Sequence, residues 1–393
     1  MTSQNDRDLE LEADGYMLRF PAVWLRDNCP CAECLDPGSG QKLNDITELP
    51  AGLAVSAAED RGESVVVTYA PDGHRSAFSR AWLAAHALDG DRDGRTNRDE
   101  RTDGDGRTDG DGRTEDDKQL WLPAELSEIP RVSWPRYLAG DRARALEAVL
   151  RLGFVLLRGV PAEPGMVLEV AASFGFVRET NYGRLFDVRV EPAPGNLAFT
   201  SRAIRPHTDN PYRDPVPTVQ LLHCLRAAGD GGDTGLVDGF AAAAALRATD
   251  AESFDTLART PIPFGYIDKE TELRASVPLI QLSPRGRIRG VRFNNRSARP
   301  LRLPYAEVIA FYAAYRRWAG LLARPERQLS LRRAPGDCLI FDNTRVLHAR
   351  TAFGLAAGPA GRHLQGCYAD LDGLASTLAV LSRSGNHGRE ESR

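Results

Sequence analysis

From about residue 196 onward, short apolar runs alternate with turn residues such as Pro284 and Gly286. Runs of about four to eight residues with many β-branched and aromatic side chains are typical of buried strands. We expect strands at 219–224, 262–267, 279–282, 288–293 and 338–341. Many short strands with few helices favour a mainly β fold, such as a sandwich or jelly roll.

Helical periodicity is confined to a few stretches of the chain. Leu146, Val149 and Leu150 share one face of a helix expected at 143–152, and Gly153 is a typical stop signal. The other expected elements are strands at 16–20, 64–69 and 154–157 and helices at 82–85, 166–174 and 305–323.

A low-complexity segment at 89–118 separates two modules. It consists almost entirely of Asp, Gly, Arg and Thr, and the six residues 103–108 are repeated at 109–114. Because it has almost no apolar side chain to bury, we expect a flexible linker or insertion. A calcium loop is disfavoured, since the Arg charges oppose a cation and no Glu closes the shell. The chain therefore divides into 1–88, 89–118 and 119–393.

Composition indicates a soluble globular protein. The chain has 393 residues, of which 42% are hydrophobic and 26% charged, with a formal net charge of -4. This charge gives no electrostatic reason to expect nucleic acid or an anionic membrane as a partner. No apolar run reaches the length of a bilayer span, and the polar start of the chain is unlike a signal or transit peptide. The crowded cysteines suggest reduced thiols, so we expect a cytoplasmic protein.

A candidate iron site centres on His207 and Asp209. Residues two apart at the end of an extended strand point to the same side, so one imidazole and one carboxylate converge. His348 follows a later apolar strand and offers a third ligand. Two His and one carboxylate on one face of an ion form the facial triad of non-haem Fe(II) oxygenases. Taken alone, His348 would favour a buried core histidine over a metal ligand.

A carboxylate clamp is expected beside this triad. Arg362 lies one hairpin beyond His348, and Thr234 lies one hairpin beyond the strand of His207. A guanidinium and a hydroxyl together suit a carboxylate that must be held at two points. A 2-oxo acid that chelates iron through its other end needs such a clamp.

The N-terminal module contains Cys29, Cys31 and Cys34 within six residues, and His74 follows a turn. A Cys3His set is typical of a closed structural zinc site. We prefer His74 over His86 as the fourth ligand, because His74 lies at a turn, where its side chain can be directed toward the cysteines, whereas His86 follows an expected helix. Redox thiols or unrelated buried cysteines are the alternatives.

The chain resembles the gamma-butyrobetaine and trimethyllysine hydroxylase branch of the TauD/TfdA-like Fe(II)/2-oxoglutarate oxygenases. The resemblance covers nearly all of the chain outside 89–118 and the termini. Its motifs are Trp24–Cys29, Asn181–Arg184, His207–Asp209, Gln220–Leu225, Gly231–Asp233, Val237–Phe240, Arg345–His348 and Arg362–Tyr368.

The resemblance implies a double-stranded β-helix (jelly-roll) catalytic domain with flanking helices, a small N-terminal zinc-binding β domain, and a homodimer. It implies Fe(II) and structural Zn(II) as metals, and 2-oxoglutarate and O2 as cosubstrates. His207, Asp209 and His348 would bind iron, and Thr234 and Arg362 would hold 2-oxoglutarate.

The resemblance also implies an aromatic cage for a trimethylammonium group, which cation–π attraction stabilises. The matching positions are Tyr182, Phe186, Phe199 and Tyr368. Phe186 and Phe199 replace the Trp and Tyr of the animal enzymes, and Phe still offers a π face.

The anionic end of the substrate distinguishes two candidates. Asn196 and Asn294 match residues that contact a substrate carboxylate, as in the conversion of gamma-butyrobetaine to L-carnitine. Asn210, Asn295 and Arg296 resemble the bacterial 2-(trimethylamino)ethylphosphonate dioxygenases instead, and Arg296 adds a cation suited to a phosphonate. Both substrates stay open at this point.

Two hypotheses from other functional classes compete with the hypothesis that the protein is an enzyme. A non-catalytic protein that binds a quaternary amine predicts an incomplete triad, whereas every ligand type is present here. A zinc-finger-type interaction protein accounts for Cys29 to Cys34 but leaves the second module unexplained.

Overall fold

The computed structural model describes residues 8–13, 16–88, 118–190, 200–354 and 361–390. The chain forms two compact units. The first unit comprises 1–108, 245–279 and 295–321, and the second comprises 109–244, 280–294 and 322–393. Two segments that follow residue 119 thus group with the N-terminal part. The linear division at 88 and 118 stays a prediction.

The first unit is built from small antiparallel sheets and short helices. Its strands are β1 (Asp8–Ala13), β2 (Tyr16–Pro21), β3 (Ala54–Asp60), β4 (Ser64–Ala70), β5 (Arg75–Ser79), β12 (Pro261–Ile267) and β13 (Glu272–Pro278). The strands pair as β1-β2, β3-β4-β5 and β12-β13. Its helices are α1 (Ala22–Asp27), α2 (Arg80–Ala85), α7 (Ala251–Arg259) and most of α8 (Tyr305–Ala323).

Two facing sheets dominate the second unit. The six-stranded sheet has the order β6 (Arg131–Ser133), β7 (Phe154–Arg158), β17 (Cys338–Asp342), β10 (Val219–Arg226), β19 (His363–Ala369) and β8 (Phe186–Arg189). The four-stranded sheet has the order β16 (Leu329–Leu331), β11 (Thr234–Asp238), β18 (Val346–Arg350) and β9 (Ile204–His207). A hairpin of β14 (Ile280–Leu282) and β15 (Ile288–Val291) completes the unit's strands in the described ranges.

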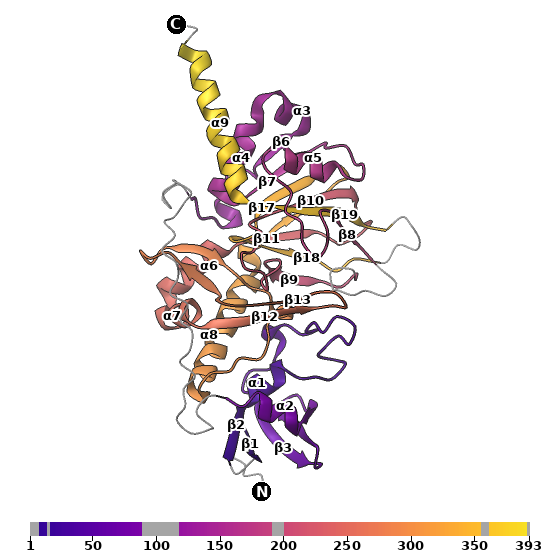
Figure 1. The fold of residues 1–393 in the computed structure, drawn as a ribbon, viewed down its shortest axis with the longest axis vertical. Helices are drawn as coiled ribbons and strands as arrows, with labels where there is room; N and C mark the ends of the chain where they lie inside the picture. The colour runs from indigo at the N-terminus through magenta and orange to yellow at the C-terminus, as the bar shows by residue number, and fades with distance from the viewer. Residues whose placement is uncertain (1–7, 14–15, 89–117, 191–199, 355–360, 391–393) are drawn as a thin grey trace. The chain divides into compact units, whose positions relative to one another are not determined.

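Helices cover one face of the six-stranded sheet. They are α3 (Trp134–Arg136), α4 (Arg142–Leu152), α5 (Met166–Ala172) and α9 (Leu371–Glu390), while α6 (Gly239–Thr249) follows β11. In Figure 1, α4, α5 and α9 lie on the same side of this sheet, and α4 and α5 contact its strands. No helix in the described part of the chain is long and apolar enough to cross a membrane.

Side chains alternate between the two faces of each strand, so one strand contributes to two separate hydrophobic cores. On β7, Val155 and Leu157 belong to the core under the helices, whereas Phe154 and Leu156 belong to the core between the sheets. Successive strand side chains point to opposite faces, so a strand buried on both faces reads as a continuous apolar run. This explains why β7, β10 and β17 were visible in the sequence.

The mainly β, double-stranded β-helix architecture is therefore confirmed. The expected helices at 143–152 and 305–323 match α4 and α8 to within one residue. The sequence reading placed His207 at the end of a strand, as β9 does, but it missed β11 and β18, which are short and partly polar, and it missed α9.

A buried ion pair joins β11 to the loop before β18. Arg345 Nη2 donates to Asp238 Oδ2 at 2.8 Å and Arg345 Nε donates to Asp238 Oδ1 at 3.1 Å, and neither side chain is exposed to solvent. Asp238 also accepts hydrogen bonds from the backbone N–H groups of Phe240 and Ala241, at the start of α6. The pair thus connects two strands and a helix beside His348.

Replacing Arg345 by Met should lower the free energy of unfolding by about 3–5 kcal/mol, because it leaves the Asp238 carboxylate buried without its counter-charge. Urea denaturation of the full-length protein measures this. The control is Arg144→Met, which removes an exposed pair with Glu128 and should cost at most about 1 kcal/mol. Equal stability of the two variants would contradict a structural role for the buried pair.

Candidate metal and cosubstrate site

Antiparallel pairing of β9 with β18 places His207 directly opposite His348. Their ring centroids are 4.1 Å apart. Asp209 follows two residues after the end of β9, and the ligand atoms of His207, Asp209 and His348 all lie within 4.8 Å of one another. The structure therefore brings the three predicted iron ligands together, and two imidazoles with one carboxylate are the donor set that Fe(II) takes in facial triads.

A backbone hydrogen bond orients His207. Its Nδ1 lies 2.9 Å from the carbonyl oxygen of Arg205, so Nδ1 must donate and Nε2 keeps its lone pair. Nε2 lies 3.4 Å from Asp209 Oδ1. A second hydrogen bond of this kind fixes the tautomer of metal-binding histidines in general.

Two side chains from the facing sheet hold the Asp209 carboxylate. Gln220 Nε2 donates to Asp209 Oδ2 at 2.8 Å, and the Tyr368 hydroxyl donates to the same oxygen at 2.9 Å. Burial and the Asp209 carboxylate raise the pKa of Tyr368 well above its usual value. The phenol therefore stays protonated and donates, which leaves Asp209 Oδ1 directed toward His207.

Asn343 holds the backbone of Asp209. Its Oδ1 accepts from Asp209 N at 2.8 Å, and its Nδ2 donates to the Asp209 carbonyl at 3.0 Å and to the Pro217 carbonyl at 2.9 Å. One amide thereby ties Asp209 to the segment that leads into β10.

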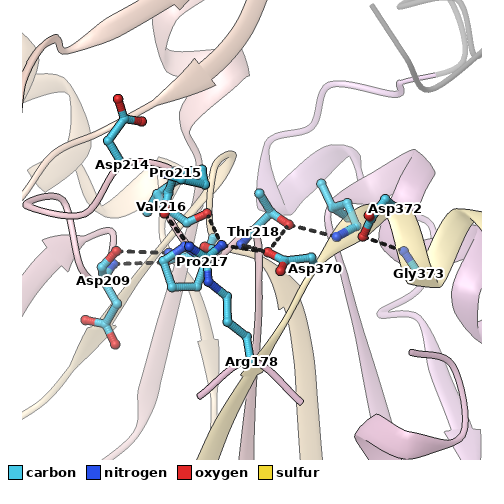
Figure 2. A network of polar contacts seen from close by, with 12 residues as sticks. Arg178, Asp209, Asp214, Pro215, Val216, Pro217, Thr218, Asp370, Asp372 and Gly373 are labelled. Carbon is cyan, nitrogen blue, oxygen red and sulfur yellow. Dashed lines mark hydrogen bonds and ion pairs between the residues drawn. The ribbon is translucent and has the colours of Figure 1, made fainter. Parts of the chain in front are cut away.

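A second polar network anchors that segment from the other side (Figure 2). Arg178 Nη1 donates to the Val216 carbonyl and to Asp370 Oδ1, both at 3.1 Å. Thr218 Oγ1 donates to Asp370 Oδ1 at 3.2 Å and accepts from Leu371 N at 2.7 Å. The loop after the His207–Asp209 motif is thus fixed at both ends.

The two residues of the predicted carboxylate clamp lie in the second unit, and Thr234 is two residues before Leu236, which pairs with His348. Arg362 immediately precedes β19, Thr234 begins β11, and both side chains are buried. Arg362 lines a cavity together with Gly231 and Gly232. A Cβ on Gly232 would lie 3.1 Å from Arg362 Cδ, so the glycine leaves room for the guanidinium.

Three of the four predicted cage positions are described, and they form one aromatic cluster. The ring centroids of Tyr182 and Phe186 are 6.2 Å apart, and those of Phe186 and Tyr368 are 5.1 Å apart. Phe186 packs over Gly366, where a Cβ would lie only 2.5 Å from its ring. Phe199 lies outside the described residues, so its role stays a prediction.

Two of the predicted amides are buried and incompletely paired. Asn210 has a φ of 54°, and within the described residues neither polar atom of its side chain has a hydrogen-bond partner. Asn294 Nδ2 donates to the Thr208 carbonyl at 3.2 Å, while its Oδ1 has no partner among those residues. Buried amides left unpaired are costly, which is consistent with a polar ligand at this place.

The remaining predicted substrate residues are Asn196, Asn295 and Arg296. Asn196 lies outside the described residues. Asn295 and Arg296 belong to the first unit, where Asn295 Nδ2 donates to the Asn44 carbonyl and Asn295 Oδ1 accepts from the Tyr315 hydroxyl, both at 3.0 Å. Their role in substrate binding stays a prediction.

The four predicted zinc ligands converge in the first unit. His74 Nε2 lies 3.3 Å from the sulfur of Cys29 and 3.6 Å from those of Cys31 and Cys34. His86 instead stacks on Trp82, with ring centroids 4.2 Å apart. Three thiols and one imidazole within 4.8 Å suit tetrahedral Zn(II).

Neighbouring donors stabilise negative charge on these sulfurs. Ser76 Oγ donates to Cys29 at 2.9 Å, and Arg26 Nη1 donates to Cys34 at 3.0 Å. Hydrogen bonding from Cys34, together with that from Ser76, outweighs burial and lowers the pKa of Cys29 to about 4. A thiolate is the form that binds a metal.

The sequence reading missed several residues of the site. Gln220 and Asn343 hold Asp209, and the Tyr212 hydroxyl lies 2.9 Å from that of Tyr182. Gln220 was quoted only as part of a motif. A polar side chain in the otherwise apolar strand β10 is the one local signal that could have found it.

Two family models and several named relatives match this chain over most of its length. Residues 117–368 match the family model described as "Taurine catabolism dioxygenase TauD, TfdA family", and residues 1–84 match "Gamma-butyrobetaine hydroxylase-like, N-terminal". A gamma-butyrobetaine dioxygenase of Pseudomonas sp. (strain AK-1) is 35% identical over 378 residues, covering 94% of this chain and 92% of the relative. The Homo sapiens gamma-butyrobetaine dioxygenase is 30% identical over 376 residues, with the same coverage.

Other relatives are more distant. The mitochondrial trimethyllysine dioxygenase of Rattus norvegicus is 29% identical over 386 residues, covering 96% of this chain and 86% of the relative. Among solved structures, an asparagine oxygenase aligns with a TM-score of 0.48 and 18% identity, covering 61% of this chain and 79% of that one.

Replacing Tyr368 by Phe should weaken metal binding about 10- to 100-fold, because it removes a donor to Asp209 but keeps the aromatic ring. Calorimetric titration with Mn(II) or Co(II) measures the dissociation constant. Tyr266→Phe removes an exposed phenol that donates to Asp268 and should leave metal affinity unchanged. Unchanged affinity in Tyr368→Phe would show that Gln220 alone suffices to hold the carboxylate.

Proposed function

Because the chain belongs to the TauD/TfdA family of dioxygenases, we propose that it is an Fe(II)- and 2-oxoglutarate-dependent dioxygenase that hydroxylates gamma-butyrobetaine. The observation that carries this proposal is the convergence of His207, Asp209 and His348 from two strands and a loop. The relatives named gamma-butyrobetaine dioxygenase, which match over most of both chains, support the choice of substrate.

His207, Asp209 and His348 would hold the iron. With 2-oxoglutarate and O2, bound Fe(II) supplies the oxidising power for hydroxylation of an unactivated C–H bond. The chain's own residues position the reactants: Gln220 and Tyr368 keep the Asp209 carboxylate in place, and Arg362 and Thr234 are proposed to hold the distal carboxylate of 2-oxoglutarate. Accurate positioning of this kind accounts for much of the catalysis in such enzymes.

The substrate cluster suits a zwitterion with charges at opposite ends. Gamma-butyrobetaine carries a trimethylammonium group, which Tyr182, Phe186 and Tyr368 can bind through their π faces. Its carboxylate accepts hydrogen bonds, and Asn210 offers a buried donor that is unpaired among the described residues. Binding at both ends selects which carbon faces the metal.

The phosphonate alternative has no separate support. It rests on the resemblance at Asn210, Asn295 and Arg296, and none of the relatives reported above is named for a phosphonate. Turnover of 2-(trimethylamino)ethylphosphonate is therefore measured as one possible outcome of the test below. A cytoplasmic location and a homodimer likewise stay predictions.

We further propose that Cys29, Cys31, Cys34 and His74 hold a structural zinc ion. Four protein ligands would leave no open position for chemistry, as in other structural sites. The cluster joins α1, the following loop and the turn before β5, so the ion would fix three segments that share little apolar core.

The decisive experiment measures succinate formed from 2-oxoglutarate by the Fe(II)-loaded protein with and without gamma-butyrobetaine. We expect strong stimulation by gamma-butyrobetaine and none by gamma-aminobutyrate, which lacks the three methyl groups. Asp209→Ala should abolish the stimulation, because it removes a metal ligand. The control is Asp255→Ala, which alters an exposed carboxylate of α7 and should retain full activity.

Trimethyllysine and 2-(trimethylamino)ethylphosphonate are assayed in parallel. A higher kcat/KM for either compound would replace gamma-butyrobetaine as the substrate while leaving the reaction class intact. Full activity of Asp209→Ala would refute the proposed iron site.

Metal analysis tests the zinc site separately. Purified protein should contain one zinc ion per chain, and Cys31→Ser should lose it and lower the midpoint of thermal unfolding. Cys367→Ala, which changes a buried cysteine of the second unit, should retain the zinc. A zinc-free wild-type protein with unchanged stability after chelation would argue against a structural ion.

A further inference from the structure

Two buried guanidinium groups, those of Arg333 and Arg362, line a single cavity in the second unit. Each side chain belongs to a residue that is only 7% exposed. Arg362 precedes β19, whereas Arg333 lies in the loop between β16 and β17. Sequence reasoning identified Arg362 but not Arg333, because nothing in the local sequence marks it.

Neither guanidinium lies within ion-pair distance of a carboxylate in the described part of the chain; Asp337, which pairs with Arg158, acts on Arg333 only from a longer distance. Arg333 Nη1 donates to the Leu222 carbonyl at 3.1 Å, but its Nη2 is buried without a hydrogen-bond partner there. The Asp233 carboxylate, at the cavity wall, lies 3.8 Å from the exposed Arg332 instead. Burial raises the pKa of the Cys224 thiol, so it stays neutral and supplies no counter-charge.

This arrangement is costly unless an anion binds. Burial, with the charges of Arg333 and Arg350, lowers the pKa of Arg362 to about 9. Buried charges without partners destabilise a fold by several kcal/mol as a general rule. A ligand carboxylate would pair with both guanidiniums.

The cavity lies on the same inner face of the barrel as the groups that hold Asp209. On β10 and β19, Gln220 pairs with Tyr368, and Cys224 pairs with Leu364. The first pair contains the two donors to Asp209, and the second pair lines the cavity. Four residues separate the pairs on each strand, which is about 13 Å. 2-Oxoglutarate is shorter than this interval, so the side chains of the metal ligands and of Arg362 have to cover the rest of it.

We infer that Arg333 is a specificity-determining residue for the cosubstrate, and that its Nη2 joins Arg362 in binding the distal carboxylate of the 2-oxo acid. The inference rests on the proposed function, which supplies 2-oxoglutarate as the cosubstrate. Two guanidiniums match the several lone pairs of one carboxylate. A 2-oxo acid without that carboxylate leaves both cations unpaired, so the site rejects it.

The test compares two ligands of equal chain length, 2-oxoglutarate and 2-oxopentanoate. Their dissociation constants are measured by calorimetry on the full-length protein loaded with Mn(II), so no turnover is needed. Arg333→Met should raise the dissociation constant of 2-oxoglutarate about 10- to 100-fold. That of 2-oxopentanoate should change less than about threefold, because this ligand lacks the group that Arg333 contacts.

Two further variants separate a binding role from a structural one. Arg144→Met alters an exposed arginine of α4 that does not line the cavity, and it should leave both constants within about threefold. Arg333→Lys keeps the positive charge but loses the planar guanidinium that can donate two parallel hydrogen bonds. Its affinity for 2-oxoglutarate should therefore fall less than that of Arg333→Met, and its affinity for 2-oxopentanoate should again stay unchanged. Lysine also preserves most of the side-chain volume if the Met variant folds poorly.

Each outcome decides the inference. If Arg333→Met weakens the binding of both ligands equally, or does not weaken that of 2-oxoglutarate, the inference is overturned. Arg333 would then be a residue that supports its loop through the Leu222 carbonyl. A wild-type protein that does not bind 2-oxoglutarate at all would instead overturn the proposed function, and the inference with it.

Discussion

The register between β9 and β18 is the constraint on which the candidate site depends. It sets His207 opposite His348, although the two residues are far apart in sequence. His348 also pairs with Leu236 on β11, so its strand is held on both sides. A shift by one residue would turn His348 to the opposite face, since side chains alternate along a strand. The buried pair of Arg345 and Asp238 ties the start of β18 to β11, three residues before His348.

Tyr368 connects the proposed metal and substrate sites. Its ring packs against Phe186 in the aromatic cluster, and its hydroxyl donates to Asp209. One rigid side chain on a central strand therefore sets the position of both groups relative to each other. Fully hydrogen-bonded buried networks of this kind hold a single geometry more strictly than any one contact does.

Buried arginines serve two different purposes in the second unit. Arg345 has an internal carboxylate, Asp238, and all of its described contacts are within the protein, so it stabilises the fold. Arg333 and Arg362 are equally buried but have no such partner in the described ranges, and they face a cavity. The presence or absence of an internal counter-charge thus separates the structural Arg345 from the two arginines that we propose bind a ligand.

The sequence by itself determined the fold class and the residue types of both metal sites. Continuous apolar runs marked β7, β10 and β17, because strands buried on both faces need no polar residues. The close spacing of His207 with Asp209, and of Cys29 with Cys34, was visible because those ligands are local. It was the tertiary structure that showed that Gln220, Tyr368 and Asn343 hold Asp209 and that Arg333 lines the same cavity as Arg362. These contacts join residues distant in sequence through hydrogen bonds and burial, and such contacts leave no periodic pattern along the chain.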